Sequence, residues 1–194
     1  KIESVEERHD RGLGIRVFLD DRMGFSFTTD FDATALRETA ERARDIARSA
    51  SPDAGWRLPA AELAAPLPFP VEESEDPSFT MPRRVEMAAA VEAAALGADP
   101  RIRRTRHAVV VDLRGEARVA NTGGLDARAR FSRAIAWVDA APTDNGASQV
   151  GSHAEFALGP RGIDAAAVGR EAALKALAKL GSAPGRTGRM PAVL

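Results

Sequence analysis

Two short apolar runs near the start of the chain flank a polar break. Residues 15–19 and 23–28 are the apolar runs, and Asp20-Asp21-Arg22 lies between them. Short apolar runs on either side of a turn-like tripeptide are typical of a β-hairpin. Gly12 and Gly14 precede the first run and indicate a tight entry or a close backbone approach.

A helix is predicted directly after this hairpin. Asp32 stands where an N-cap is expected, at the start of a helix over residues 33–49. The apolar positions along this segment follow spacings of four, three and four, which place them on one helical face. They are Leu36, Ala40, Ala43 and Ala47. The arginine and glutamate residues between them form the solvated side.

The character of the sequence changes between Ser51 and Pro82. This stretch holds seven prolines and the acidic residues Glu72, Glu73, Glu75 and Asp76. Proline at this density removes helix and ladder hydrogen bonds, so we expect an extended connector on the surface. Pro82 suits the first turn of a further helix, which is predicted to run to about Leu96 and to stop at Gly97.

Strand patterns dominate from Ile102 to Leu158. They predict strands over 107–113, 116–120, 127–138 and 149–158, with turns at 121–124 and 145–146. Consecutive strands joined by short turns favour an antiparallel meander. Asp164 is then predicted to cap a closing helix that ends at Leu180, before Gly181.

The fold class predicted from these elements is α+β, because strands and helices do not alternate regularly. We expect a hairpin-plus-helix module over residues 1–64 and a proline-rich acidic connector over 65–82. A helix, an antiparallel sheet and a closing helix are expected to form a middle domain over 83–189. The chain opens on Lys1 and closes on the apolar residues 190–194. We therefore expect a piece of a longer protein, with 190–194 as the first strand of a missing C-terminal domain.

Composition narrows the classes of protein. The chain has 194 residues, 44% of them hydrophobic and 28% charged, with a net charge of -1, which is ordinary for a globular protein. The absence of cysteine excludes disulfides, thiolate metal sites and cysteine nucleophiles, and fits a reducing cytoplasm. No apolar run approaches the roughly 20 residues that span a bilayer, and no signal peptide opens the chain. We expect a cytoplasmic protein without a membrane partner.

The residues that could carry chemistry do not form a recognisable site. His9, His107 and His153 are the only histidines, and none has a second histidine three or four positions away, as local zinc-ligand pairs require. No Gly-x-Ser-x-Gly elbow occurs, and Ser152 and His153 would point to opposite faces of a strand. Gly12-x-Gly14 precedes a strand, whereas a dinucleotide-binding loop follows one. We therefore expect no catalytic, metal-binding or cofactor-binding residues in this chain.

Arginines are concentrated in the predicted sheet. Nine of them lie between Arg101 and Arg133, against the three acidic residues Asp112, Glu116 and Asp126. Three interpretations stay open: a solvated sheet face, an interface with an acidic partner or peptide, and a nucleic-acid surface. Phe131 is the only aromatic residue nearby, whereas a single-strand platform needs several. A further hypothesis is that the long strand over 127–138 accepts an extended peptide by strand addition.

Several segments resemble the TldD/PmbA family, the "modulator of DNA gyrase" proteins. The opening Arg11-Gly12-Leu13-Gly14-Ile15-Arg16-Val17-Phe18, with Gly24-Phe25-Ser26 and Thr28-Thr29-Asp30, resembles the first hairpin of the family. The segments over 47–53, 98–102, 119–124 and 168–173 are similar to later family elements, and Thr187-Gly188 with 191–194 resembles the first strand of its C-terminal domain. Their order and spacing over nearly the whole chain make the resemblance specific.

The resemblance implies a metallopeptidase subunit. TldD-type subunits carry a His-Glu-x-x-x-His zinc motif in the C-terminal domain, PmbA (TldE)-type subunits lack it, and the two types form a heterodimer that cleaves unfolded or small peptides. Residues 47–53 are closer to the PmbA type. The implied role is non-catalytic: this chain would shape the peptidase cavity and the dimer interface, with a homologous subunit as partner and zinc bound in the catalytic partner or the missing C-terminal domain. The alternative is a regulatory module that acts on DNA gyrase or nucleic acid without proteolysis.

Overall fold

The structure is a computed structural model that describes residues 2–59, 69–73, 76–183, 185 and 187–189. The chain divides into two compact units. The first consists of Lys1–Pro66 and Arg118–Arg128, and the second of Leu67–Ala117 and Ala129–Leu194. The predicted strand over residues 190–194 and parts of the predicted connector, residues 65–68 and 74–75, lie outside the described residues.

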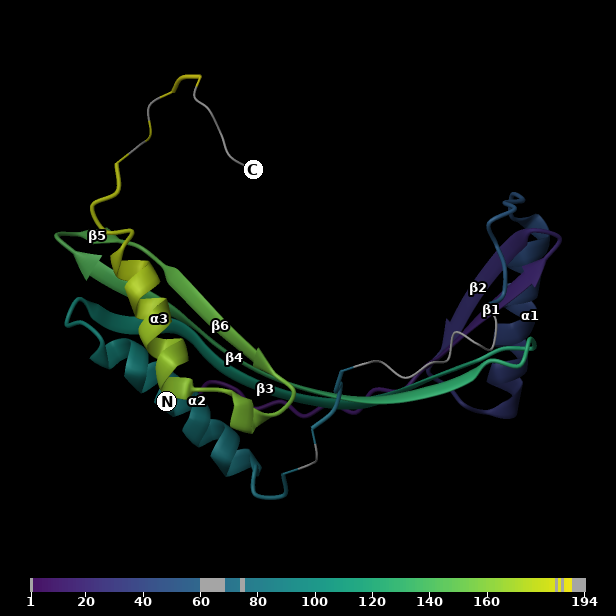
Figure 1. The fold of residues 1–194 in the computed structure, drawn as a ribbon, viewed down its shortest axis with the longest axis horizontal. Helices are drawn as coiled ribbons and strands as arrows, with labels where there is room; N and C mark the ends of the chain where they lie inside the picture. The colour runs from purple at the N-terminus through teal and green to yellow at the C-terminus, as the bar shows by residue number, and fades with distance from the viewer. Residues whose placement is uncertain (1, 60–68, 74–75, 184, 186, 190–194) are drawn as a thin grey trace. The chain divides into compact units, whose positions relative to one another are not determined.

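The first unit contains the predicted hairpin and helix. Strands β1 (Leu13–Leu19) and β2 (Arg22–Thr28) pair antiparallel and are followed by helix α1 (Ala33–Ser49) (Figure 1). One face of the hairpin packs on α1 at Gly24, where a Cβ would overlap the carbonyl oxygen of Ala43 and the backbone nitrogen of Ala47. Glycine is therefore required for this close approach of strand and helix.

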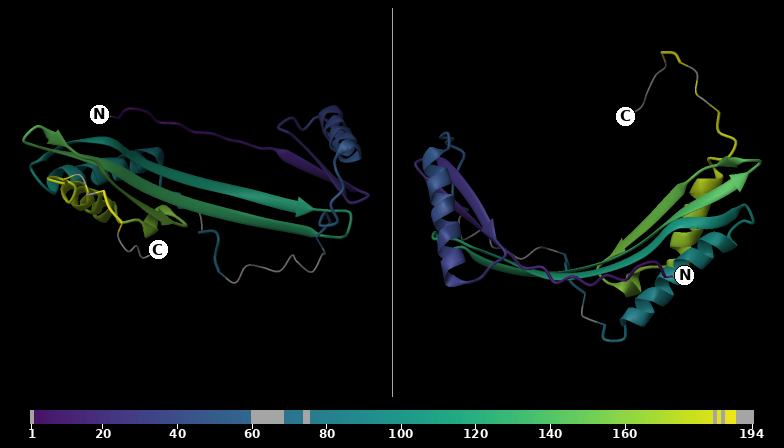
Figure 2. Two further views of the ribbon diagram at one scale, coloured as in Figure 1. Left: turned by 90° about the horizontal axis from the view of Figure 1, so that it is seen from above. Right: turned by 180° about the vertical axis from the view of Figure 1, so that it is seen from behind.

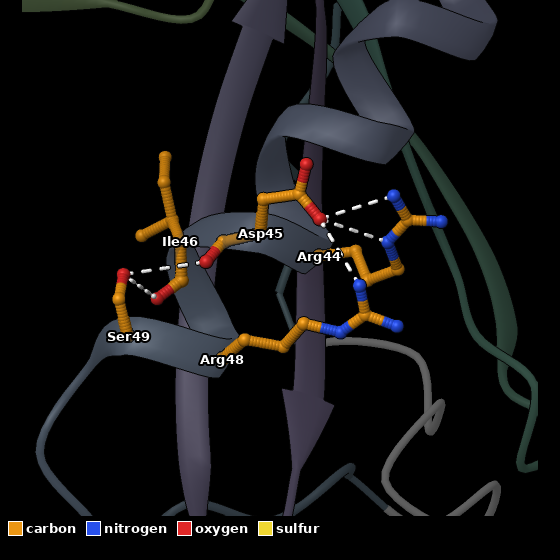
Figure 3. Close-up of polar contacts among 5 residues, drawn as sticks. All are labelled: Arg44, Asp45, Ile46, Arg48 and Ser49. Carbon is orange, nitrogen blue, oxygen red and sulfur yellow. Dashed lines mark hydrogen bonds and ion pairs between the residues drawn. The ribbon is translucent and has the colours of Figure 1, made fainter.

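The two ends of α1 are held differently. Asp32 occupies the N-cap position, as predicted, but its side chain makes no capping hydrogen bond. At the other end, the Asp45 carboxylate contacts Arg44 at 3.0 Å and Arg48 at 3.5 Å (Figure 3). Ser49 Oγ donates to the carbonyl of Ile46 at 3.1 Å. Ser49 thus adds a second hydrogen bond to the Ile46 carbonyl, which already accepts from the backbone nitrogen of Ala50 at 3.0 Å.

The second unit is an antiparallel sheet with two helices on one side. Its elements are α2 (Met81–Gly97), β3 (Ile102–Ala120), β4 (Asp126–Asp144), β5 (Ala147–Ser148), β6 (Gly151–Ala157), the 3-10 turn η2 (Pro160–Gly162) and α3 (Ala165–Leu177). Strand β4 is central, with β3 on one side and β5 and β6 on the other. The tip of the β3–β4 hairpin, over residues 118–128, belongs to the first unit. The predicted α+β fold with a closing helix is confirmed.

Helices α2 and α3 lie side by side against one face of this sheet (Figures 1 and 2). Small residues bring the layers together: Gly169 of α3 meets the Val91 carbonyl and Ala95 of α2, and Gly151 of β6 meets Ala176 of α3. The buried core is correspondingly rich in alanine. It comprises Val91, Ala95, Ile102, Ala134, Ala136, Val138, Ala140, Ile163, Val168, Ala172, Ala173 and Ala176.

The strands of the sheet are longer than the sequence predicted. Two strands were expected over residues 107–113 and 116–120, but β3 is continuous across Gly115. The break is absent because the ring of Phe131 on β4 fills the space beside Gly115, and a glycine covered in this way is tolerated in a strand. Strand β4 also extends to Asp144, beyond the predicted end at Val138.

The closing helix is shorter than predicted. It ends at Leu177 rather than Leu180. The helix is followed by tighter turns, in which the backbone nitrogens of Lys179 and Leu180 donate to the carbonyls of Ala176 and Leu177, three residues earlier. Gly181 follows with a φ of 75°, which favours glycine.

The described part of the connector docks on β4. The backbone nitrogen of Ser132 donates to the carbonyl of Val71 at 3.0 Å, and Ser132 Oγ accepts from the nitrogen of Glu73 at 2.7 Å. Further along, Arg161 Nε donates to Asp76 Oδ2 at 2.9 Å. These polar bonds hold the described part of the connector to the rest of the second unit.

Candidate interface on the open sheet face

The sheet of the second unit has two different faces. Along β4, Ala134, Ala136 and Val138 are fully buried under α2 and α3. Because side chains alternate along a strand, Ile135 and Trp137 point to the opposite side. That side is turned away from both helices (Figure 2).

We call this second side the open face. Its members are Val109, Val111, Leu113 and Gly115 of β3, Phe131, Arg133, Ile135, Trp137 and Asp139 of β4, and Ser152, Ala154 and Phe156 of β6. Within the described residues, Phe156 is 69% exposed and Leu113 is 48% exposed. A sheet face that meets water normally alternates to polar residues. A contiguous apolar group left exposed is typical of an interaction surface.

The dimensions of the open face suit the centre of a protein interface. Strand β6 has seven residues, and at about 3.3 Å per residue and about 4.8 Å per strand a three-stranded face covers about 300 Å². A stable dimer buries about 800 Å² on each partner. The open face could therefore supply the apolar centre of such an interface, with neighbouring surface supplying the rest.

One end of the open face is polar. Ser152 Oγ donates to Asp139 Oδ1 at 2.6 Å, and His107 Nδ1 lies 3.2 Å from Asp139 Oδ2. The hydrogen bond from Ser152, followed by that from His107, holds the pKa of Asp139 below its usual range. Asp139 is therefore an ionised acceptor with both oxygens occupied.

The other candidate residues are not brought together. His153 Nδ1 contacts Lys175 Nζ at 2.8 Å on the helix side of the sheet, so Ser152 and His153 do lie on opposite faces. His9 pairs with Glu7 at 3.4 Å in the first unit. No group of three or more histidine, aspartate or glutamate side chains that could hold a metal ion occurs in the part of the chain that the structure describes. The zinc site that the family resemblance implies is expected in the catalytic partner or in the C-terminal domain, not among these residues.

Several arginines in and beside the sheet have polar partners within the described residues. Arg118 binds Asp126 at 2.6 Å and Arg130 binds Glu116 at 3.4 Å. Arg101 binds Asp99 at 2.8 Å, and Arg114 donates to the carbonyl of Glu73 at 2.9 Å. Three of these arginines are therefore held in ion pairs, whereas Arg114 bonds an uncharged carbonyl oxygen.

The open face was not among the features predicted from the sequence. The available signal was the unbroken apolar run of residues 134–138, because a strand covered on both sides shows such a run in place of alternation. The bond between Ser152 and Asp139 depends on the register of β6 against β4, in which these two residues are directly opposite. A register of this kind is not visible in the sequence.

Two models of known protein families together match most of the chain. Residues 1–47 match the model for the PmbA/TldA metallopeptidase domain 1. Residues 74–180, more than half of the chain, match the model for the PmbA/TldA metallopeptidase central domain. The chain belongs to the PmbA/TldD metallopeptidase family. The two matched segments correspond to an N-terminal and a central domain, as the sequence resemblance predicted.

Relatives of the PmbA/TldD family give the same result. The metalloprotease PmbA of Escherichia coli O157:H7 is 38% identical over 111 residues, which are 54% of this chain and 23% of that protein. TldE from Thermococcus kodakarensis has a TM-score of 0.65 at 19% identity and covers 91% of this chain. A Thermotoga maritima protein, named for modulation of a DNA gyrase, has a TM-score of 0.75 at 18% identity and covers 92%. The match spans 40% of each solved chain, so these structures establish the fold of this part only.

The described helices were also compared with what a membrane-spanning helix requires. Among the residues that the structure describes, no helix has both the length and the apolar character needed to cross a bilayer.

Proposed function

We propose that this chain is the non-catalytic amino-terminal part of a PmbA/TldD-type metallopeptidase subunit, and that its open face contacts a homologous subunit around the peptidase cavity. The observation that carries the proposal is the exposed apolar side of the β3–β4–β6 sheet. Phe156 and Leu113 lie on this side and are largely exposed in the described residues, and burial of such residues against a partner is favourable by roughly 25 cal/mol per Å².

The proposal assigns the chemistry to another part of the assembly. Zinc would be bound in the C-terminal domain of a TldD-type subunit, as the family resemblance implies. This chain would contribute by helping to enclose the hydrolytic site. Walls around a hydrolytic site restrict access to unfolded or small peptides, and this form of selectivity needs no reactive group in the wall.

The proposal can be tested by measuring subunit association with the full-length gene product and its homologous subunit. Phe156→Glu places a charge on the open face, and the exposure of this residue should leave the fold intact. We expect the substitution to weaken association at least tenfold in sedimentation velocity. Leu174→Glu is the matched control, because Leu174 is also an exposed apolar residue, 59% exposed, but lies on α3. Equal association of wild type and both variants would contradict the proposal.

The alternative function is a regulatory module that acts on DNA gyrase or nucleic acid. It is less well supported because Arg101, Arg118 and Arg130 are already paired with carboxylates. A nucleic-acid surface would give binding that falls steeply with salt. A DNA titration at two salt concentrations that shows such binding would favour the alternative.

A further inference from the structure

The hydrogen bonds of Asp139 determine which nitrogen of His107 carries a proton. An ionised carboxylate only accepts, and Asp139 Oδ2 lies 3.2 Å from His107 Nδ1. The proton of the neutral imidazole therefore sits on Nδ1. Ser152 holds the other carboxylate oxygen at 2.6 Å, which fixes the carboxylate that orients the ring.

In its neutral form, His107 consequently presents a bare Nε2 at the polar end of the open face. The imidazole is largely exposed, and among the described residues Nε2 has no hydrogen-bond partner. An oriented nitrogen lone pair at the margin of an apolar surface is a directional acceptor. A surface that covers it without offering a donor would leave this acceptor unsatisfied, at a cost of about 1–3 kcal/mol.

His153 provides an internal contrast on the opposite face of the sheet. Its Nδ1 lies 2.8 Å from Lys175 Nζ. A lysine ammonium only donates, so His153 Nδ1 accepts and the proton of its neutral ring sits on Nε2. The chain thus holds two histidines in opposite tautomers, each set by one neighbouring charged group.

We propose that His107 Nε2 is a specificity-determining acceptor that takes a hydrogen bond from a neutral donor, a hydroxyl or an amide, on the homologous subunit that covers the open face. The inference rests on the proposed function and names the chemistry of the partner surface. That surface would be apolar opposite Leu113 and Phe156, with one uncharged donor opposite His107.

The surrounding charges favour a neutral donor. Arg106 lies close enough to Asp139 to contribute to the lowering of its pKa, so the negative charge at this end already has a cationic neighbour. A carboxylate would face the lone pair of Nε2 and would find no hydrogen to accept. The open face carries only one other charged residue, Arg133. A largely uncharged partner surface is therefore the best complement.

The first test is spectroscopic and reads the tautomers directly. In the full-length subunit, ¹⁵N chemical shifts of the imidazoles should show the Nδ1–H form for His107 and the Nε2–H form for His153. Asp139→Asn should shift His107 away from the Nδ1–H form, because an amide can donate to Nδ1, and should leave His153 unchanged. An Nε2–H signal for His107 in the wild-type subunit would overturn the assignment.

The second test measures association with the homologous subunit. His107→Ala and Asp139→Asn should each weaken association about tenfold, which corresponds to about 1.4 kcal/mol, while His153→Ala should have no effect. Circular dichroism and urea midpoints show whether each variant remains folded. Asp139→Asn adds a readout beyond folding, since it keeps the size of the side chain and changes the tautomer of His107.

The outcomes separate this inference from the proposed function. Weaker association for Phe156→Glu with no change for His107→Ala and Asp139→Asn would retain the interface and overturn the role of His107. No change for any of the three would overturn both. Protection of His107 from diethyl pyrocarbonate in the isolated full-length subunit would show that the same polypeptide covers the open face, and this too would overturn the inference.

Discussion

The aromatic ring of Phe131 on β4 lies against the Cα of Gly115 on β3, so closely that a Cβ at position 115 would overlap it. The contact explains why β3 runs unbroken through a glycine. A glycine weakens a strand because it adds no side chain to pack. Here an aromatic residue from the neighbouring strand covers the gap, an arrangement known to restore the stability that the glycine costs.

A double-mutant cycle should reveal this dependence. Gly115→Val should destabilise the wild-type protein, because the valine side chain displaces the Phe131 ring. In a Phe131→Ala background the same change should stabilise, since valine fills the vacated space and favours strands. We expect a coupling free energy of about 1–2 kcal/mol in urea unfolding. Additive effects would show that ring and glycine do not interact.

The close packing of α3 on α2 predicts a larger loss of stability when Gly169 is substituted. A Cβ there would meet backbone atoms, the carbonyl oxygen of Val91 and the nitrogen of Ala95, and these cannot move aside as a side chain can. Gly169→Val should therefore lower the free energy of unfolding by about 3 kcal/mol. Gly97→Ala is the control. No atom lies within 4 Å of the added methyl group, so this change at the end of α2 should be neutral or slightly stabilising.

The local elements were predictable because their signals are local. Helix α1 has the predicted bounds Ala33–Ser49, since its apolar spacing and its flanking residues indicate both ends. The hairpin was equally clear, because Asp20 and Asp21 form its turn with positive φ angles. Both residues tolerate this conformation better than most.

The continuity of β3 and the polar end of the open face were not predictable in this way. Each depends on residues far apart in the chain: Phe131 decides whether the strand breaks at Gly115, and Asp139 becomes part of a site only when His107 and Ser152 reach it. Strand register brings these residues together, and register depends on the whole sheet. The same holds for the cap of α1, where Asp32 is in the expected position but makes no capping bond.

The two helix N-caps should therefore differ in their effect on stability. Asp164 accepts hydrogen bonds from the backbone nitrogens of Ala166 at 2.9 Å and Ala167 at 3.0 Å. Asp164→Ala should lower the free energy of unfolding by about 1 kcal/mol. Asp32→Ala should cost clearly less, because no such bond is lost. Thermal or urea unfolding of both variants checks the difference, and equal losses would contradict the geometry at α1.

The contact between Asp76 and η2 should make the docking of the connector sensitive to acid. Hydrogen bonds from Ser78 and then from Arg161 lower the pKa of Asp76 from 3.8 to about 2. Because the folded-state pKa is the lower one, ionised Asp76 stabilises the fold above about pH 4, and this contribution disappears as the pH falls towards 2. Asp76→Asn should therefore destabilise the protein at pH 6 and lose its effect near pH 2.

Urea midpoints measured between pH 2 and pH 6 test this dependence on Asp76. Asp10→Asn is the control, because it removes the same charge from an exposed residue that makes no hydrogen bond within the described chain. The difference between the Asp76→Asn midpoint and the wild-type midpoint should shrink steadily below pH 4, while the control should follow wild type throughout. A difference that stays constant across the whole range would mean that the ionised form of Asp76 does not hold the connector.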